Sequence, residues 1–290
     1  MIEGLKLRVI TAVALMVSLV LVSILVPPYF FAFLMAFLVL MATWEWAGLV
    51  GLDNFRSRVA YQSTVALMLV GTFFLIEVRP CATAINALHG SMILVLGLLW
   101  WLLAFIMLLG FPGNTRYWAD RSRIGLMGVL TLVPAWTGMV MLKYLAPQGY
   151  LIISLVTLVA AVDIGAYFAG TCYGKRKLAP KLSPNKSWEG VWGGLFATIA
   201  VGLLFIWCFG RFVVSLSLWQ AVVLMLLCLL IAWLAVVGDL VESMLKRHSH
   251  VKDSGQLLPG HGGLLDRVDS LMAVTPGYVL TVMFTLFEME

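Results

Sequence analysis

The chain has 290 residues, of which 62% are hydrophobic and only 11% are charged, and its mean hydropathy is +1.01. Soluble domains carry roughly 25% charged residues, so a chain this apolar could not cover its own surface and a soluble fold is excluded. The net charge of +5 would suit nucleic acid in a soluble protein. Here the placement of the basic residues indicates membrane topology and anionic substrates instead, and no nucleic-acid partner is expected.

Apolar blocks close to the length of about 20 residues that a helix needs to cross a bilayer predict an all-α, polytopic transmembrane bundle of about nine helices. In chain order the expected helices cover residues 9–26, 29–50, 60–76, 91–111, 124–145, 150–170, 188–208, 217–238 and 268–286. The first block follows Lys6 and Arg8, as in a signal peptide. It leads through Pro27-Pro28 straight into the next block with no small-residue cleavage site, so we expect a retained helix.

The basic residues test this helix count. With the N-terminus and every second connection on one side, that side holds 16 of the 19 lysines and arginines, and the other side holds Arg79, Lys143 and Arg211. Because basic residues accumulate in the cytoplasm, we expect a cytoplasmic N-terminus and a periplasmic, outside C-terminus. The unbroken set of cytoplasmic loops favours a bacterial cell inner membrane.

Two polar loops, 173–187 and 239–267, fall on the predicted cytoplasmic side. We therefore expect residues 1–145 to form an N-terminal group of transmembrane helices. Residues 146–290 are expected to form a C-terminal catalytic transmembrane domain that carries both loops.

The first loop has five basic residues between 174 and 190, interleaved with Ser183, Asn185 and Ser187. Basic charge alone is also typical of a loop that touches anionic lipid headgroups. Hydroxyl, amide and ammonium groups together suit phosphate oxygens. A Walker A motif is excluded, because Arg176 stands where that motif has Ser or Thr.

The second loop begins as a charged extension of the helix predicted at 217–238. One face of that helix carries residues at i, i+3, i+4, i+7 and i+8, namely Asp239, Glu242, Ser243, Lys246 and Arg247. Asp266, Asp269 and Ser270 repeat the i, i+3, i+4 spacing at the start of the last helix, and Asp163 lies on a polar stripe of the sixth.

Acids at membrane depth cost about 2.5–3.5 kcal/mol to insert and usually face a polar interior. For Glu242, a packing ion pair with a nearby Lys or Arg is an equally good interpretation. For Asp239 and Asp266 a functional role is favoured, because Gly238 and Gly262-Gly263 beside them allow the backbone to approach a ligand closely. Carboxylates next to many cations suit Mg²⁺ that bridges to phosphate.

Two further polar residues are less informative. Glu45 lies between Trp44 and Trp46 near a predicted helix end, which favours an interfacial position over catalysis. His261, in Pro-Gly-His-Gly-Gly, could touch phosphate or cap its turn.

Taken together, these residues form a long pattern: Ser243-x-Leu245-Lys246-Arg247-x4-Lys252-Asp253-x-Gly255-x2-Leu258-Pro259-x-His261-Gly262-Gly263-Leu264-x-Asp266-Arg267-Val268-Asp269. Over all 27 positions from 243 to 269 this pattern resembles the signature of the phosphatidate cytidylyltransferases, also called CDP-diacylglycerol synthases. Residues 183–190 also resemble a family segment, with Ser187 where Thr is commoner. The specific resemblance covers about residues 160–270.

The resemblance implies that the phosphate of phosphatidate attacks the α-phosphorus of CTP, which releases pyrophosphate and forms CDP-diacylglycerol. It implies a polytopic, Mg²⁺-dependent homodimer, and it matches the family's metal ligands to Asp239 and Asp266. A second cation, such as K⁺, is also considered.

The nucleophile is already anionic, so charge neutralisation and positioning should dominate catalysis. The expected catalytic set is Asp239, Asp266, Lys246, Lys252 and Arg267. The expected substrate contacts are Lys186, Ser187, Ser243, Arg247, His261, Gly262, Gly263, Asp269 and Asp163. The lipid tails are expected to enter from the surrounding membrane lipid, between helices.

Two alternatives stay open at this point. A CTP-dependent polyprenol or phytol kinase would release CDP rather than pyrophosphate. A transporter for an anionic solute would also use intramembrane acids and a basic cavity, although the charges here cluster at one face without matching broken helices in two halves.

Overall fold

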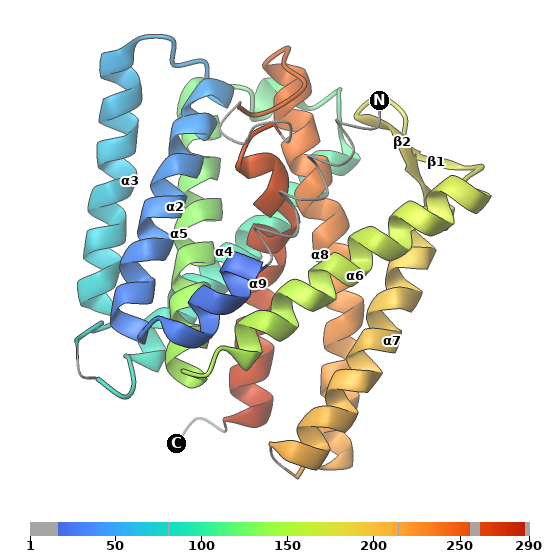
Figure 1. The fold of residues 1–290 in the computed structure, drawn as a ribbon. Helices are drawn as coiled ribbons and strands as arrows, with labels where there is room; N and C mark the ends of the chain where they lie inside the picture. The colour runs from blue at the N-terminus through green and yellow to red at the C-terminus, as the bar shows by residue number, and fades with distance from the viewer. Residues whose placement is uncertain (1–16, 81, 214, 256–261, 288–290) are drawn as a thin grey trace.

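The computed structural model describes residues 17–80, 82–213, 215–255 and 262–287, and it shows a bundle of long helices (Figure 1). Residues 17–25 are helical. They are followed by α2 (Pro28–Leu49), α3 (Phe55–Leu75), α4 (Ala87–Leu109), the 3₁₀ turn η1 (Thr115–Tyr117), α5 (Arg121–Leu145), α6 (Tyr150–Tyr173), β1 (Lys177–Ala179), β2 (Ser183–Ser187), α7 (Trp188–Phe212), α8 (Leu218–His248) and α9 (Leu265–Leu286). Within the described residues, α2 to α9 are the eight helices long and apolar enough to cross a membrane. The predicted polytopic helical bundle is confirmed.

The largest differences from the predicted helix bounds lie at charged helix ends. Helix α3 begins at Phe55 rather than at 60, and α8 continues ten residues past 238 to His248. Helix α8 starts with a capping box, in which the side chains of Ser217 and Gln220 each bind the other residue's backbone N–H. Its charged last turns stay helical because their polar side chains share one face while the other face stays packed.

The loop predicted at 173–187 contains a small antiparallel hairpin. Strands β1 and β2 pair Lys177 with Ser187 and Ala179 with Ser183. The Arg247 Nε atom donates a hydrogen bond to the Leu182 carbonyl at 3.2 Å, which ties the hairpin to the end of α8. This long-range pairing places β2 beside the charged face of α8.

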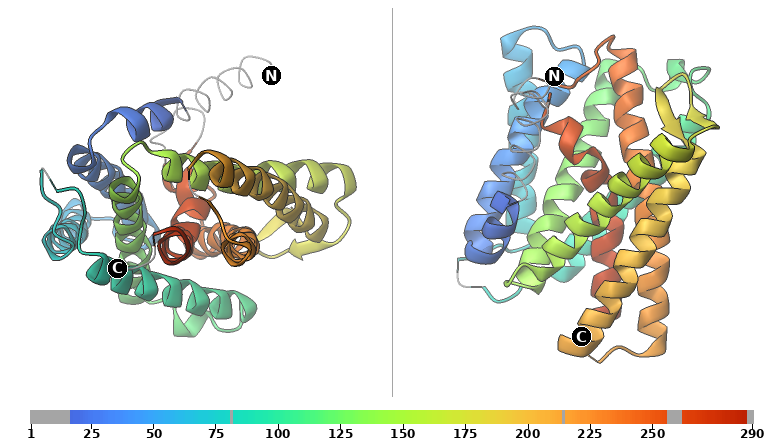
Figure 2. Two further views of the ribbon diagram at one scale, coloured as in Figure 1. Left: turned by 90° about the horizontal axis from the view of Figure 1, so that it is seen from below. Right: turned by 45° about the vertical axis from the view of Figure 1, so that its right-hand side comes forward.

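Helices α5 and α9 form the centre of the bundle and are the most buried of the eight spans. Helix α8 packs along α9, and α6 packs along α7. Figure 2 shows the α6–α7 pair projecting from the rest of the bundle, with the β-hairpin at its far end. The exposed apolar side chains of α3, α4 and α7 suit contact with lipid.

The connections gather at two opposite ends of the bundle. At one end, here called the polar end, the α2–α3 connection, the start of α5 and the last residues of α8 line one cavity of about 540 Å³. At the other end, the Tyr144 hydroxyl donates to the Arg79 carbonyl at 3.2 Å, and the Gln220 amide donates to the Thr285 carbonyl at 2.6 Å. Successive connections of the described helices therefore lie at alternate ends of the bundle, as predicted. The side of the membrane that each end faces stays a prediction.

Candidate active site

Three helices bring their acidic residues to one cavity near the polar end. The cavity, of about 390 Å³, is lined by Asp163 of α6, by Asp239, Glu242 and Lys246 of α8, by Asp253 of the α8–α9 connection, and by Asp266, Arg267, Asp269 and Ser270 of α9. The i, i+3 spacing on α8 and on α9 turns each pair of acids toward this space. The structure therefore assembles residues that the sequence placed on separate helices.

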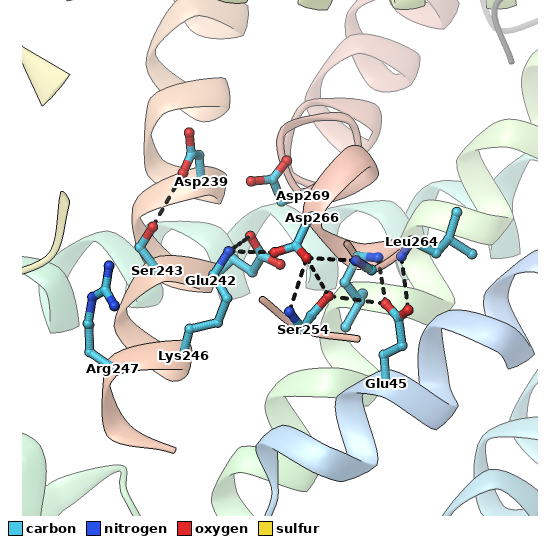
Figure 3. Close-up of polar contacts among 12 residues, drawn as sticks. Glu45, Asp239, Glu242, Ser243, Lys246, Arg247, Ser254, Leu264, Asp266 and Asp269 are labelled. Carbon is cyan, nitrogen blue, oxygen red and sulfur yellow. Dashed lines mark hydrogen bonds and ion pairs between the residues drawn. The ribbon is translucent and has the colours of Figure 1, made fainter. Parts of the chain in front are cut away.

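Lys246 lies between two of these acids (Figure 3). Its ammonium group is 2.9 Å from Glu242 Oε2 and 2.6 Å from Asp266 Oδ1, and its side chain is only 13% exposed. The ion-pair interpretation of Glu242 is thus the one that the structure shows. The sequence predicted phosphate contacts for Lys246, whereas here its ammonium bridges two carboxylates across α8 and α9.

Asp239 binds cationic and hydroxyl groups from two elements. Its Oδ2 atom pairs with the ammonium of Lys186, which projects from β2. Its Oδ1 atom accepts a hydrogen bond from the Ser243 hydroxyl at 3.4 Å. Both members of the Asp239–Lys186 pair are about one-third exposed, so this pair borders solvent or ligand space.

A second cavity, of about 590 Å³, adjoins the first through Asp163 and Asp239, which line both. Its wall is formed by α6, the β-hairpin, the start of α7 and the middle of α8. The lining combines polar groups such as Asn185 and Lys186 with apolar side chains such as Val191. Such a space suits a ligand with a charged head and an apolar remainder.

Backbone and hydroxyl groups fix the orientation of Asp266. Its Oδ2 atom accepts hydrogen bonds from the Ser254 N–H at 3.0 Å, the Ser254 hydroxyl at 3.1 Å and the Gly263 N–H at 2.9 Å. Gly262 has a φ of +81°, and a Cβ on Gly263 would lie 2.1 Å from Ser254 Oγ. The glycines were expected to let the backbone approach a ligand, and in the structure they let it approach the protein's own polar side chains.

The remaining predicted site residues have varied surroundings. Ser187 is buried and caps α7 by accepting from the Gly190 N–H at 3.2 Å, and its hydroxyl proton stays available to donate to a ligand oxygen. Lys252 is exposed, and so is Arg267, which lines the acidic cavity. Arg247 binds the hairpin through its Nε atom. His261 lies outside the described residues.

Glu45 is a site residue that the sequence interpretation missed. It is 4% exposed, and its carboxylate binds the start of α9 and the Ser254 hydroxyl. The interfacial interpretation was wrong, and its neighbour Trp46 is likewise buried and donates from its indole to the Ile124 carbonyl. No local pattern could reveal this, because the partners are more than 200 residues away in the chain.

The donor chemistry of the acidic cavity fits Mg²⁺. No cluster of three or more His, Cys, Asp or Glu side chains suited to a metal is present in the described ranges. However, Mg²⁺ usually takes one or two carboxylates and completes its shell with water and substrate phosphates. Asp239 and Asp266 already hold cationic ammonium groups, and the buried Glu242 Oε1 has no hydrogen-bond partner among the described residues.

Comparison with known proteins decides the family. A model described as the cytidylyltransferase family matches residues 6–286, nearly the whole chain. The chain belongs to the cytidylyltransferase family. This cytidylyltransferase is 44% identical over 272 residues, 94% of both chains, to the phosphatidate cytidylyltransferase of Pseudomonas aeruginosa. It is 33% identical to that of Haemophilus influenzae over 97% of this chain and all of the relative. It is 40% identical to that of Bacillus subtilis over 55% of this chain and 60% of the relative.

Membership in this family makes the protein an enzyme of the nucleotidyltransferase class. Carboxylate and ammonium groups converge at the acidic cavity from α6, α8, α9 and the α8–α9 connection.

Proposed function

We propose that this enzyme transfers the cytidylyl group of CTP to phosphatidate. An oxygen of the lipid phosphate attacks the α-phosphorus of CTP, the bond from that phosphorus to the bridging oxygen of the β-phosphate breaks, and pyrophosphate leaves. The products are CDP-diacylglycerol and pyrophosphate. The relatives named phosphatidate cytidylyltransferase over nearly their full length support this substrate pair.

The observation that carries the proposal is the contact between the two cavities. The acidic cavity and the larger, partly apolar cavity share Asp163 and Asp239. A reaction between a lipid phosphate and a nucleotide triphosphate needs an apolar approach for one substrate and a charged meeting point for both. We infer that the lipid head enters between α6, α7 and the hairpin, and that the triphosphate lies over the acidic cavity.

The basic residues at this junction neutralise the reacting phosphates. The phosphate of a monoester carries about −1.5 to −2 charges at neutral pH, so two anionic substrates repel each other unless cations lie between them. Lys186, Lys246 and Arg267 are placed at the cavity from β2, α8 and α9. When substrate phosphates arrive, Lys186 and Lys246 exchange their carboxylate contacts for phosphate oxygens, and the carboxylates become available.

Asp239 and Asp266 would hold Mg²⁺ in the working enzyme, with a second cation such as K⁺ beside Asp163 or Asp269. The metal would neutralise charge on the phosphate oxygens during transfer. Ser254 and Gly263 keep the Asp266 carboxylate oriented by donating to its Oδ2 atom. Lys252, Arg247 and Ser243 are further candidates for phosphate contacts. The substrate contact expected for His261 stays a prediction.

The polar end is proposed to face the cytoplasm, where CTP is available, in a bacterial inner membrane. Of the described basic residues, Arg79, Lys143 and Arg211 are those assigned to the opposite side, which agrees with the positive-inside rule. A reporter fused at Glu290 should read periplasmic, and a cytoplasmic reading would contradict this topology. The homodimer stays a prediction that mass measurement in detergent tests.

The test is pyrophosphate release by purified protein given CTP, Mg²⁺ and phosphatidate, with each omitted in turn. Release that needs all three, with CDP-diacylglycerol formed in equal amount, is the expected result. Release of CDP with a phosphorylated alcohol, when a polyprenol or phytol replaces phosphatidate, would indicate the lipid-kinase alternative. Folded protein that releases neither product, in a lipid mixture that supports a related enzyme, would overturn the proposal.

A further inference from the structure

Glu45 lies in α2, within the part of the chain to which no catalytic role is assigned, yet it contacts the charged site directly (Figure 3). Its Oε1 atom accepts from the Leu264 N–H at 2.9 Å. Its Oε2 atom accepts from the Leu265 N–H at 2.9 Å and from the Ser254 hydroxyl at 3.1 Å. A carboxylate that is 4% exposed and accepts three hydrogen bonds is a built feature of the fold.

The first two contacts cap α9 from another helix. The first N–H groups of a helix have no partner within that helix, and a negative charge near them is favourable. Leu264, at the N-cap position of α9, provides no side-chain cap. The carboxylate of Glu45 replaces that cap and fixes the start of α9, which carries Asp266 and Asp269.

The third contact links Glu45 to Asp266. The Ser254 hydroxyl is 3.1 Å from Glu45 Oε2 and 3.1 Å from Asp266 Oδ2. A hydroxyl has a single proton to donate, so Ser254 shares that proton between the two carboxylates and lies between them, which links their positions. The Ser254 and Gly263 N–H groups then orient the same Asp266 oxygen.

The connection between α8 and α9 is shaped around this carboxylate. A Cβ on Gly255 would lie 2.4 Å from Glu45 Oε1, and a Cβ on Gly263 would lie 2.6 Å from Oε2. Real Cβ atoms do not come that close, so the loop wraps around Glu45 only because both positions lack side chains. Geometry, burial and hydrogen bonding therefore all converge on one residue.

We propose that Glu45 is a positioning residue for cytidylyl transfer. It acts through Ser254 and the start of α9 to hold Asp266 in the orientation that the reaction needs. The inference rests on the proposed function for its kinetic consequence. From the sequence, the catalytic residues were expected only within 146–290, whereas Glu45 gives α2, in the N-terminal group of helices, a part in the active site.

The test compares Glu45→Gln with the matched control Glu77→Gln, in the full-length enzyme. The amide of glutamine keeps the shape but puts an NH₂ group against a backbone N–H or the Ser254 hydroxyl. Glu77 is half-exposed beyond the end of α3 and pairs with Arg79. Loss of a group that orients a metal-binding side chain typically costs about 10–100-fold in metal affinity or activity. We expect Glu45→Gln to lower kcat by about that factor and to raise the Mg²⁺ concentration for half-maximal rate several-fold, with Glu77→Gln unchanged.

Two readouts separate positioning from general stability. Amide exchange in substrate-free protein should rise at 264–265 in Glu45→Gln and stay as in the wild type elsewhere in the bundle. Binding of Mn²⁺ alone, followed by its paramagnetic resonance signal, should weaken by about tenfold. A lower kcat with unchanged Mn²⁺ binding and unchanged exchange at 264–265 would overturn the proposal.

A second variant keeps the test decisive if Glu45→Gln does not fold. Ser254→Ala removes the bridging hydroxyl but keeps the N–H that binds Asp266, and we expect kcat to fall about tenfold. Wild-type turnover in folded Glu45→Gln, or in Ser254→Ala, would overturn only the role of Glu45. A wild-type enzyme that releases no pyrophosphate would overturn the proposed function and with it the kinetic role assigned here.

Discussion

Two lysines at opposite ends of the bundle, one largely and one fully buried, bind different kinds of partner. Lys246, at the polar end, lies between the carboxylates of Glu242 and Asp266. Lys143, in the last turn of α5, is fully buried and donates to the Ser23 and Pro147 carbonyls, each at 2.5 Å. No carboxylate pairs with Lys143 among the described residues.

The difference separates a site that can exchange partners from a permanent structural contact. Carbonyls near helix C-termini carry partial negative charge and are fixed in position in the folded chain. Lys143 therefore links two helix ends as long as the protein is folded. Carboxylates can release an ammonium group when a metal or a phosphate arrives. For these two lysines, carboxylate partners therefore accompany the charged site, and backbone partners accompany a structural contact.

The largest effect is expected for Asp266→Asn, which removes one partner of Lys246 and one predicted metal ligand. We expect turnover to fall on the order of 10³-fold, within the range seen when a key electrostatic contact to the transition state is lost. Mn²⁺ binding should fall with it, while the helical content measured by circular dichroism is retained. Asp53→Asn, in the exposed α2–α3 connection, is the control. Near-normal turnover in folded Asp266→Asn protein would contradict the metal assignment.

Lys246→Met tests whether the ammonium at the polar end takes part in transfer. Its loss leaves Glu242 and Asp266 without their shared cation, and we expect kcat to fall about 10²-fold. Lys181→Met, in the exposed turn of the hairpin, should keep wild-type kcat. Turnover within about twofold of wild type in Lys246→Met would show that this lysine only neutralises its two acids.

Gly255→Ala tests the support behind Asp266. The added Cβ would lie 2.4 Å from Glu45 Oε1, so the loop or the carboxylate must move. We expect kcat to fall about tenfold, in line with the loss of an orienting contact, together with a lower melting temperature. Gly71→Ala is the matched control, since a Cβ there meets nothing within 4 Å. Equal behaviour of the two variants would show that the loop has room around Glu45.

The smallest effect on catalysis is expected for Lys143→Met. The buried Ser23 carbonyl and the Pro147 carbonyl lose their donor, at a cost of about 1–3 kcal/mol in the free energy of unfolding. The melting temperature in detergent should fall by several degrees, while kcat per folded molecule stays at the wild-type value. A large loss of kcat without a change in melting temperature would remove the distinction between the two lysines.

Much of the fold and part of the site could be predicted because their signals are local. Each span is an apolar block whose own length and hydropathy determine that it crosses a membrane. The face shared by Asp239, Glu242 and Lys246 follows from helical periodicity alone. The hairpin at 177–187 was missed, since its two short strands have no alternating apolar pattern. Lys143 was assigned to the side opposite the polar loops, but its burial and its backbone partners were not predicted.

The amino-acid sequence by itself determined the membrane class, the spans, the charged face of α8 and the family signature, because each depends on residues close together along the chain. Only the tertiary structure decided which groups meet. It placed Glu45 against residues 254, 264 and 265, Lys246 between acids of two helices, and Lys143 against the Ser23 carbonyl. These pairings depend on how helices pack, and packing brings together residues that no local pattern relates.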